Sequence, residues 1–238
     1  TEKIAGSNKI QYVKIAPVEK KDYYPLSSAQ KRMYILNRIE QDSTGYNECH
    51  KILIEGRLDR HKLEDAFQRF TDRHEITRTG FEMLDEGPVQ RVYDHIGFKM
   101  PFMKVKPEEA DHLAAGFVKP FDLAKPPLFR VSLLETDIDK HILLLDIHHI
   151  IIDGASFGIM IKEVLALYEG REPDRQEIQY KDFANWQNTF LKSPDMKKQE
   201  DYWLQQFSGE IPVLNLPADH QRPVVQSFSG KKVYFALG

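Results

Sequence analysis

Two apolar runs in the middle of the chain have the pattern of buried β-strands. They cover residues 128–134 and 141–149, and the polar link 135–140 separates them. Short apolar runs bounded by polar turns are typical of strands that are covered on both faces. A short link can join two strands only if they are antiparallel. We therefore expect these segments to form two central, antiparallel strands of one sheet.

Three segments before these strands have the apolar spacing of an amphipathic helix. The first follows Ser27 or Ser28, and the second follows Asp59; serine and aspartate are preferred N-caps. The third begins with Pro107 and two acidic residues, which suit the first turn of a helix. Its buried face would carry alanine, leucine and phenylalanine side chains between residues 110 and 117.

The remaining chain adds helices after the second central strand and strands elsewhere. After Gly154 the apolar spacing predicts a helix, for which we expect Ser156 to be the cap. Further helices are expected around 183–191 and 196–207, and further strands at 46–55, 77–83, 89–93 and 232–237. The pattern indicates an α/β (α+β) fold, a mixed but mainly antiparallel sheet covered by helices.

Composition narrows the class of protein. The 238 residues are 41% hydrophobic and 29% charged, which is ordinary for a globular chain. The 33 basic and 36 acidic side chains give a net charge of -3, so the charge does not favour a nucleic-acid partner. The sequence has no stretch of about 18 apolar residues, so no membrane span is predicted. The single cysteine, Cys49, excludes an internal disulfide, and we expect a cytoplasmic protein.

Adjacent histidines at the end of the second central strand are the main candidates for chemistry. His148 and His149 precede Asp153 and Gly154 by a few residues. Successive side chains of a strand point to opposite faces, so one imidazole packs inside while the other can face a cleft. The same alternation argues against both rings binding one metal ion, and no cysteine or acidic cluster completes a zinc site.

Asp153 and Gly154 lie where the strand turns into the next helix. A charge at this turn needs a partner, and we expect an arginine. Glycine would let the backbone or a ligand approach closely. The alternative is structural: two hydrogen-bonded core histidines and an aspartate in a helix-entry turn. That alternative is the better explanation of a lone histidine, but here the accompanying motifs favour a functional site.

Those motifs occur in a fixed order along the chain. They read SSAQKRMYIL (residues 27–36), RHEITRTGF (73–81), HHIIIDG (148–154) and YKDFANWQ (180–187). The ordered set, which spans about residues 23–190, resembles the condensation domains of nonribosomal peptide synthetases, whose active-site element is HHxxxDG. Ile147 and Ala155 stand where that family often has methionine and tryptophan. Family members have two lobes, and the second-lobe motifs are absent here. The resemblance implies a linker or tail at residues 1–22 and an N-terminal lobe at 23–238.

The resemblance implies a fold and a reaction. The fold is a chloramphenicol-acetyltransferase-like lobe, and the reaction is amide formation by attack of an aminoacyl amine on an aminoacyl or peptidyl thioester. Both substrates would be held on phosphopantetheine arms of partner proteins, so no cofactor is expected on this chain itself. The implied partners are upstream and downstream peptidyl carrier domains, an adjoining adenylation domain and the C-terminal lobe of the same condensation domain. Neither nucleic acid nor a membrane is expected as a partner.

The resemblance also assigns roles. His149, the second histidine, is the expected catalytic residue, and His148 is its structural partner. Asp153 is expected to pair with Arg78 and so to hold the loop that aims His149, with Gly154 as a further supporting residue. Arg73 is the competing partner of Asp153; otherwise it is a solvated helix-end arginine. Whether His149 acts as a base or as a positioning and stabilising group stays open.

The other motif residues are expected to be structural. Ser27 and Gln30 should support the first helix rather than contact substrate, and Tyr180 and Trp186 should belong to the core. Cys49 is expected to be a small buried apolar residue rather than a nucleophile.

Two other functions remain open. One is a free-standing acyltransferase of the same fold that uses coenzyme A, which needs no carrier partner. The other is a non-catalytic lobe that only docks carrier proteins, and the presence of His149, Asp153 and Arg78 counts against it.

Overall fold

The computed structural model describes residues 14–217, 219–221, 224 and 233. The chain divides into two units, residues 1–193 and 194–238. The second unit contains helix α6 (Pro194–Gln206), close to the helix expected at 196–207. The strand expected at 232–237 lies outside the described residues apart from residue 233, which is not in a strand. Within the described part of the chain, no helix has the length and apolar character needed to cross a membrane.

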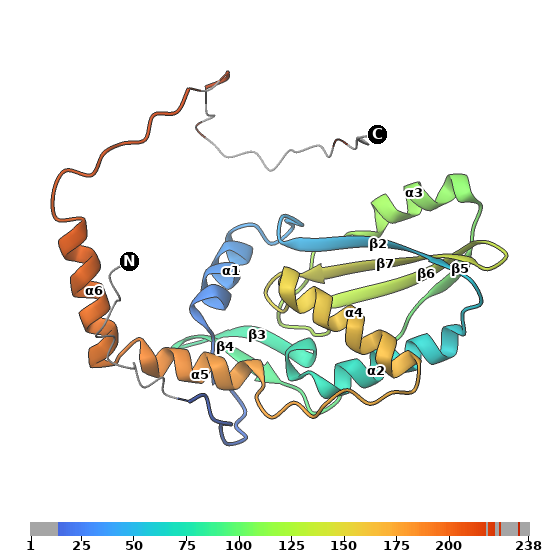
Figure 1. Ribbon diagram of the computed structural model, residues 1–238, viewed down its shortest axis with the longest axis horizontal. Coiled ribbons are helices and arrows are strands. Elements are labelled where there is room, and N and C mark those ends of the chain that lie inside the picture. Colours follow the sequence, from blue (N-terminus) through green and yellow to red (C-terminus); the bar gives the residue numbers. More distant parts are fainter. Residues whose placement is uncertain (1–13, 218, 222–223, 225–232, 234–238) are drawn as a thin grey trace, which may run out of the picture. The chain divides into compact units, whose positions relative to one another are not determined.

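A four-stranded sheet forms the centre of the first unit (Figure 1). Its strands lie in the order β2 (Asn47–Glu55), β7 (Lys140–His148), β6 (Phe129–Asp137) and β5 (Phe102–Lys104). All neighbours are antiparallel except β5 and β6, which are parallel. The two central, antiparallel strands expected from the apolar runs are therefore confirmed as β6 and β7.

Helices cover both faces of this sheet, which explains why its central strands are almost continuously apolar. Helices α2 (Arg60–Arg73) and α4 (Gly154–Tyr168) pack on one face, where they share a core with Leu143, Leu145 and Ile147 of β7. Helix α3 (Pro107–Phe117) packs on the other face, against the intervening residues of the same strand. The odd-numbered residues of β7 thus face α2 and α4.

A smaller sheet and two helices complete the first unit. The sheet has the order β1 (Tyr24–Pro25), β4 (Gly87–Val92) and β3 (Thr79–Leu84). A short 3-10 helix, η1 (Glu75–Arg78), leads into β3, and the helices are α1 (Ser28–Ile39) and α5 (Tyr180–Phe190). Ser27 caps α1 and Asp59 caps α2, as the sequence predicted.

Candidate functional site

His148 is the last residue of β7, and its ring belongs to the core. The residue is 2% exposed, and Nδ1 accepts a hydrogen bond of 3.1 Å from the backbone N–H of Ile150. The ring of Phe121 meets it edge-on at 6.2 Å. Burial, with a smaller contribution from the charge of His149, lowers the pKa of His148 to about 4. The ring is therefore neutral near pH 7 and serves as a hydrogen-bond acceptor within the fold.

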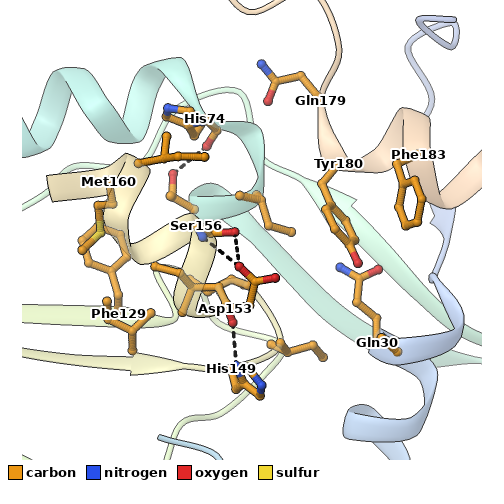
Figure 2. A pocket seen from close by; sticks show the side chains of 18 of the residues that line it. Gln30, His74, Phe129, His149, Asp153, Ser156, Met160, Gln179, Tyr180 and Phe183 are labelled. Carbon is orange, nitrogen blue, oxygen red and sulfur yellow. Dashed lines mark hydrogen bonds between the residues drawn. The ribbon is translucent and has the colours of Figure 1, made fainter. Parts of the chain in front are cut away.

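His149 follows the end of β7 and lies at a pocket. Its backbone N–H donates to the carbonyl of Tyr46 over 2.8 Å, which continues the β2–β7 pairing by one residue. Its Nδ1–H donates to the carbonyl of Ile152 over 2.7 Å (Figure 2). A neutral imidazole protonated on Nδ1 carries its lone pair on Nε2. No hydrogen bond within the described residues uses that Nε2, and the side chain is 36% exposed. The two histidines thus have the opposite environments expected from strand alternation.

The pocket beside His149 has a volume of about 490 Å³ and mainly apolar walls. It is lined from the β7–α4 loop and from α1, α2, α4 and α5, and its lining includes Gln30, Phe70, His74, His149, Asp153, Met160, Tyr180 and Phe183. A cavity of this size with apolar walls and a few polar groups is typical of a small-ligand site.

Asp153 is the N-cap of α4, so the expectation that Ser156 caps this helix is wrong. The carboxylate accepts hydrogen bonds from the backbone N–H and the hydroxyl of Ser156, over 2.8 and 2.6 Å. The side-chain hydrogen bond from Ser156, followed by the backbone one, lowers the pKa of Asp153. Because α4 begins at Gly154, Asp153 occupies the cap position and Ser156 supplies the donors.

The expected ion pair between Asp153 and Arg78 is also wrong. Arg78 instead donates hydrogen bonds to the backbone carbonyls of Tyr93 and Asp72. Asp153 lies in an exposed position at a helix N-terminus, so its charge needs no arginine partner. Arg78, the last residue of η1, thus holds the end of that helix next to Tyr93, the residue that follows β4.

Arg73, the competing partner, contacts helix α4 at another place. Its Nε donates to a carboxylate oxygen of Glu163 over 3.0 Å, and its side chain is largely buried, so it is not a solvated helix-end arginine. His74 Nε2 donates to the same Glu163 oxygen over 2.7 Å and lines the pocket. Burial, only partly opposed by Glu163, lowers the pKa of His74.

The structure does not show the close approach expected at Gly154. A Cβ built on this residue would meet no described atom within 4 Å. The described part of the chain therefore gives no packing reason for glycine at the start of α4.

The structure contains an ion pair between a buried carboxylate and a guanidinium that the sequence pattern did not predict. Asp146 on β7 is fully buried, and it lies opposite Arg130 of β6 in the strand register. Arg130 approaches one carboxylate oxygen to 3.3 Å, and Asn47 Nδ2 donates to the other over 2.8 Å. The available signal was a lone carboxylate two residues before the histidine pair, within an apolar strand.

Three further expectations about motif residues need correction or refinement. Ser27 and Gln30 form a capping box and so support α1 as expected, but Gln30 also lines the pocket. Tyr180 lines the pocket too, and its hydroxyl lies 3.0 Å from that of Ser27. Cys49 is on β2 as expected but is exposed rather than buried. Among the described residues, no group of three or more histidine, cysteine or acidic side chains is arranged to hold a metal ion.

Comparison with known proteins places this geometry in a family. The model of the condensation domain matches residues 20–238. Gramicidin S synthase 2 of Brevibacillus brevis is 45% identical over 228 residues, which are 96% of this chain and 5% of that protein. Tyrocidine synthase 3 of Brevibacillus parabrevis is 44% identical over 235 residues, 99% of this chain and 4% of that protein. The chain therefore spans about one-twentieth of these relatives.

Solved structures give the same fold. The X-domain from teicoplanin biosynthesis has a TM-score of 0.77 and 25% identity, over 89% of this chain and 49% of that one. The starter condensation domain of the rhizomide synthetase has a TM-score of 0.70 and 24% identity, over 78% of this chain and 48% of that one. The fold class and the resemblance inferred from the four motifs are confirmed: the chain belongs to the condensation-domain family.

Proposed function

We propose that this chain is the N-terminal half of a catalytic condensation domain in a nonribosomal peptide synthetase. The observation that carries this proposal is His149, whose Nδ1–H is held by the Ile152 carbonyl and whose Nε2 is left available beside an apolar pocket. The relatives that match nearly the whole chain are peptide synthases, which supports the same reaction class. Their length fits a multidomain protein that contains carrier and adenylation domains, and we place it in the cytoplasm.

In the proposed reaction, the amine of one aminoacyl group attacks the thioester carbonyl of another aminoacyl or peptidyl group. The new C–N bond forms, the C–S bond breaks, and the amine proton ends on the released thiol. Nε2 of His149 is suited to accept or share that proton, or to hydrogen-bond the tetrahedral species. Both substrates would arrive on phosphopantetheine arms of carrier domains. Neither a covalent acyl-enzyme nor a cofactor bound by this chain is required.

The proposed division of the chain is a linker at residues 1–22 followed by a lobe at 23–238. This chain covers about half of each solved domain, which supports a second, C-terminal lobe as the other wall of the site. Of the supporting residues, His148 and Asp153 would act by shaping the loop around His149. Arg78 and Gly154 would act less directly.

A binding role without catalysis is the second candidate. The X-domain from teicoplanin biosynthesis, which shares the fold, is known in a complex with OxyB, so that domain serves as a binding partner. A free-standing acyltransferase that uses coenzyme A is the third. Amide formation that requires carrier-bound donor and acceptor distinguishes the first proposal from both.

The experiment is His149→Ala in a protein that contains both halves of the domain, with loaded donor and acceptor carriers. Loss of a positioned acid–base group should lower the rate of amide formation by about 10²–10⁴-fold. His112→Ala removes an exposed imidazole outside the pocket and is the matched control. An unchanged rate in His149→Ala would favour the binding role, and turnover of a small coenzyme A thioester without carriers would favour the third candidate.

A further inference from the structure

Glu48 lies next to the imidazole of His149 at the end of the sheet. In the β2–β7 register Glu48 is paired with Ile147, so both side chains point to the sheet face that carries the pocket. One carboxylate oxygen of Glu48 lies 2.6 Å from Nδ1 of His149. The Glu48 side chain is only 24% exposed, so solvent screens this contact incompletely.

The contact places a carboxylate beside Nδ1 of His149. The Nδ1–H donates to the Ile152 carbonyl, and the Glu48 carboxylate lies at ion-pair distance from the same nitrogen. The hydrogen bond to Ile152 keeps the proton on Nδ1 and leaves Nε2 as the basic atom of the neutral ring. A carboxylate near Nδ1 also stabilises the positive charge that appears when Nε2 takes up a proton.

The other titratable groups around the ring either have hydrogen-bond partners of their own or carry no negative charge. Asp153 accepts two hydrogen bonds from Ser156 at the N-terminus of α4. His148 is neutral near pH 7 because burial lowers its pKa to about 4. His50, two residues after Glu48, lies 3.8 Å from the other Glu48 oxygen. Within the described part of the chain, Glu48 is the acidic residue that forms an ion-pair contact with His149.

We infer that Glu48 is a positioning residue that orients the imidazole of His149 and stabilises its protonated form. The inference rests on the proposed catalytic role of His149. Glu48 does not line the pocket, so it acts through the ring and not on the substrate.

Glu48→Gln, which removes the charge but keeps the size of the side chain, tests this inference in the protein with both domain halves. Glu55→Gln is the matched control, because Glu55 is an exposed residue on the same strand and lies about 23 Å further along it. We expect Glu48→Gln to lower kcat by about 10–100-fold. This is the effect known for residues that orient a functional histidine of a metal site through its other ring nitrogen. KM should change little, because the charge that Glu48 stabilises develops only during reaction.

The division of the effect between kcat and KM separates this role from simple structural support. A distorted fold or pocket would also raise KM, whereas loss of a charge that acts only during reaction lowers kcat alone. Glu55→Gln should change neither value. A raised KM with an unchanged kcat in Glu48→Gln would overturn the inference, and so would values of kcat and KM equal to those of Glu55→Gln.

The outcome is distinct from that of the test of function. If His149→Ala retains activity, the proposed function fails; if His149→Ala is inactive but Glu48→Gln behaves like Glu55→Gln, only the role of Glu48 fails. Cooperative melting of each variant is measured first. If Glu48→Gln does not fold, Glu48→Asp replaces it, since its charge is retained but withdrawn by one methylene. A lowered kcat with an unchanged KM in Glu48→Asp supports the inference, and a kcat equal to that of Glu55→Gln overturns it.

Discussion

The backbone N–H of Ile150 donates a hydrogen bond to Nδ1 of His148, and this bond requires that nitrogen to be unprotonated. Burial lowers the pKa of His148 to about 4, whereas a histidine in the unfolded chain has a pKa of about 6.5. Between these values the unfolded state binds more protons, so the free energy of unfolding falls as the pH falls. The expected loss from this residue between pH 7 and pH 4 is about 3 kcal/mol.

Urea denaturation over that pH range checks the expectation. His148→Asn keeps a hydrogen-bond acceptor but does not titrate, so its stability should depend less steeply on pH than that of the unmodified chain. His74, whose pKa burial also lowers, is present in both proteins and cancels in the comparison. Parallel curves for the two proteins would contradict the buried, neutral state of His148.

Replacement of Asp153 by alanine should cost about 1 kcal/mol of folding free energy, the usual value of an N-cap. Asp153→Asn should cost less, because asparagine caps as well as aspartate. Asp59→Ala, which removes the cap of α2, should have a similar effect and serves as the comparison. Chemical denaturation measures all three.

Arg78→Ala and Asp153→Ala should have additive effects on stability, because no contact joins the two side chains. A double-mutant cycle tests this expectation. A coupling energy well above the ~0.5 kcal/mol expected of independent sites would show that the two side chains do form an ion pair, contrary to the structure.

Asp146 and Arg130 should instead be strongly coupled. Asp146 is fully buried whereas the Arg130 side chain is 28% exposed, so removal of Arg130 leaves a buried carboxylate without its counter-charge, at a cost of about 3–5 kcal/mol. The pair Lys20 and Asp94, in which both side chains are exposed, is the control, and little coupling is expected there. Equal coupling energies in the two cycles would show that burial of Asp146 does not matter.

The 238-residue chain should fold by itself and yet form no amide product. Its core is complete on both faces of the four-stranded sheet, so cooperative melting is expected. His149, however, is partly exposed, and nothing in one lobe alone is proposed to orient two tethered substrates. Proximity and orientation are worth about 7–11 kcal/mol in such a reaction. Product formed from loaded carriers at the rate of the two-lobed protein would contradict this expectation.

The regular elements followed from local pattern, whereas side-chain pairing did not. Burial between layers produces a regular pattern of apolar residues in the sequence. This pattern is seen in the apolar runs of β6 and β7 and in the apolar spacing of α2. Which residue pairs with a given charge depends on strand register and exposure, and neither produces a regular pattern in the sequence. Local pattern therefore predicted a partner for Asp153, which is exposed, and none for Asp146, the carboxylate whose burial requires a partner.

The cap of α4 shows a second limit. Asp153 and Ser156 are both good cap residues, three positions apart, and local preference does not choose between them. The start of the helix decides the assignment, and packing of α4 on the sheet fixes that start. Glu48 was not found for a related reason: it lies about 100 positions from His149 in sequence, and only the pairing of β2 with β7 brings them together.

The hydrogen bond from His149 to the Ile152 carbonyl closes a small loop whose next residue, Asp153, caps α4. The length of this loop therefore determines both the direction of the imidazole and the residue at which the helix starts. Adding or deleting one residue between His149 and Asp153 would shift the start of α4 relative to the end of β7 or free the ring, because the hydrogen bond to Ile152 spans this interval. The interval between the second histidine and the aspartate is thus a fixed length, and its isoleucines are constrained as well, because Ile150 and Ile151 are buried in the core.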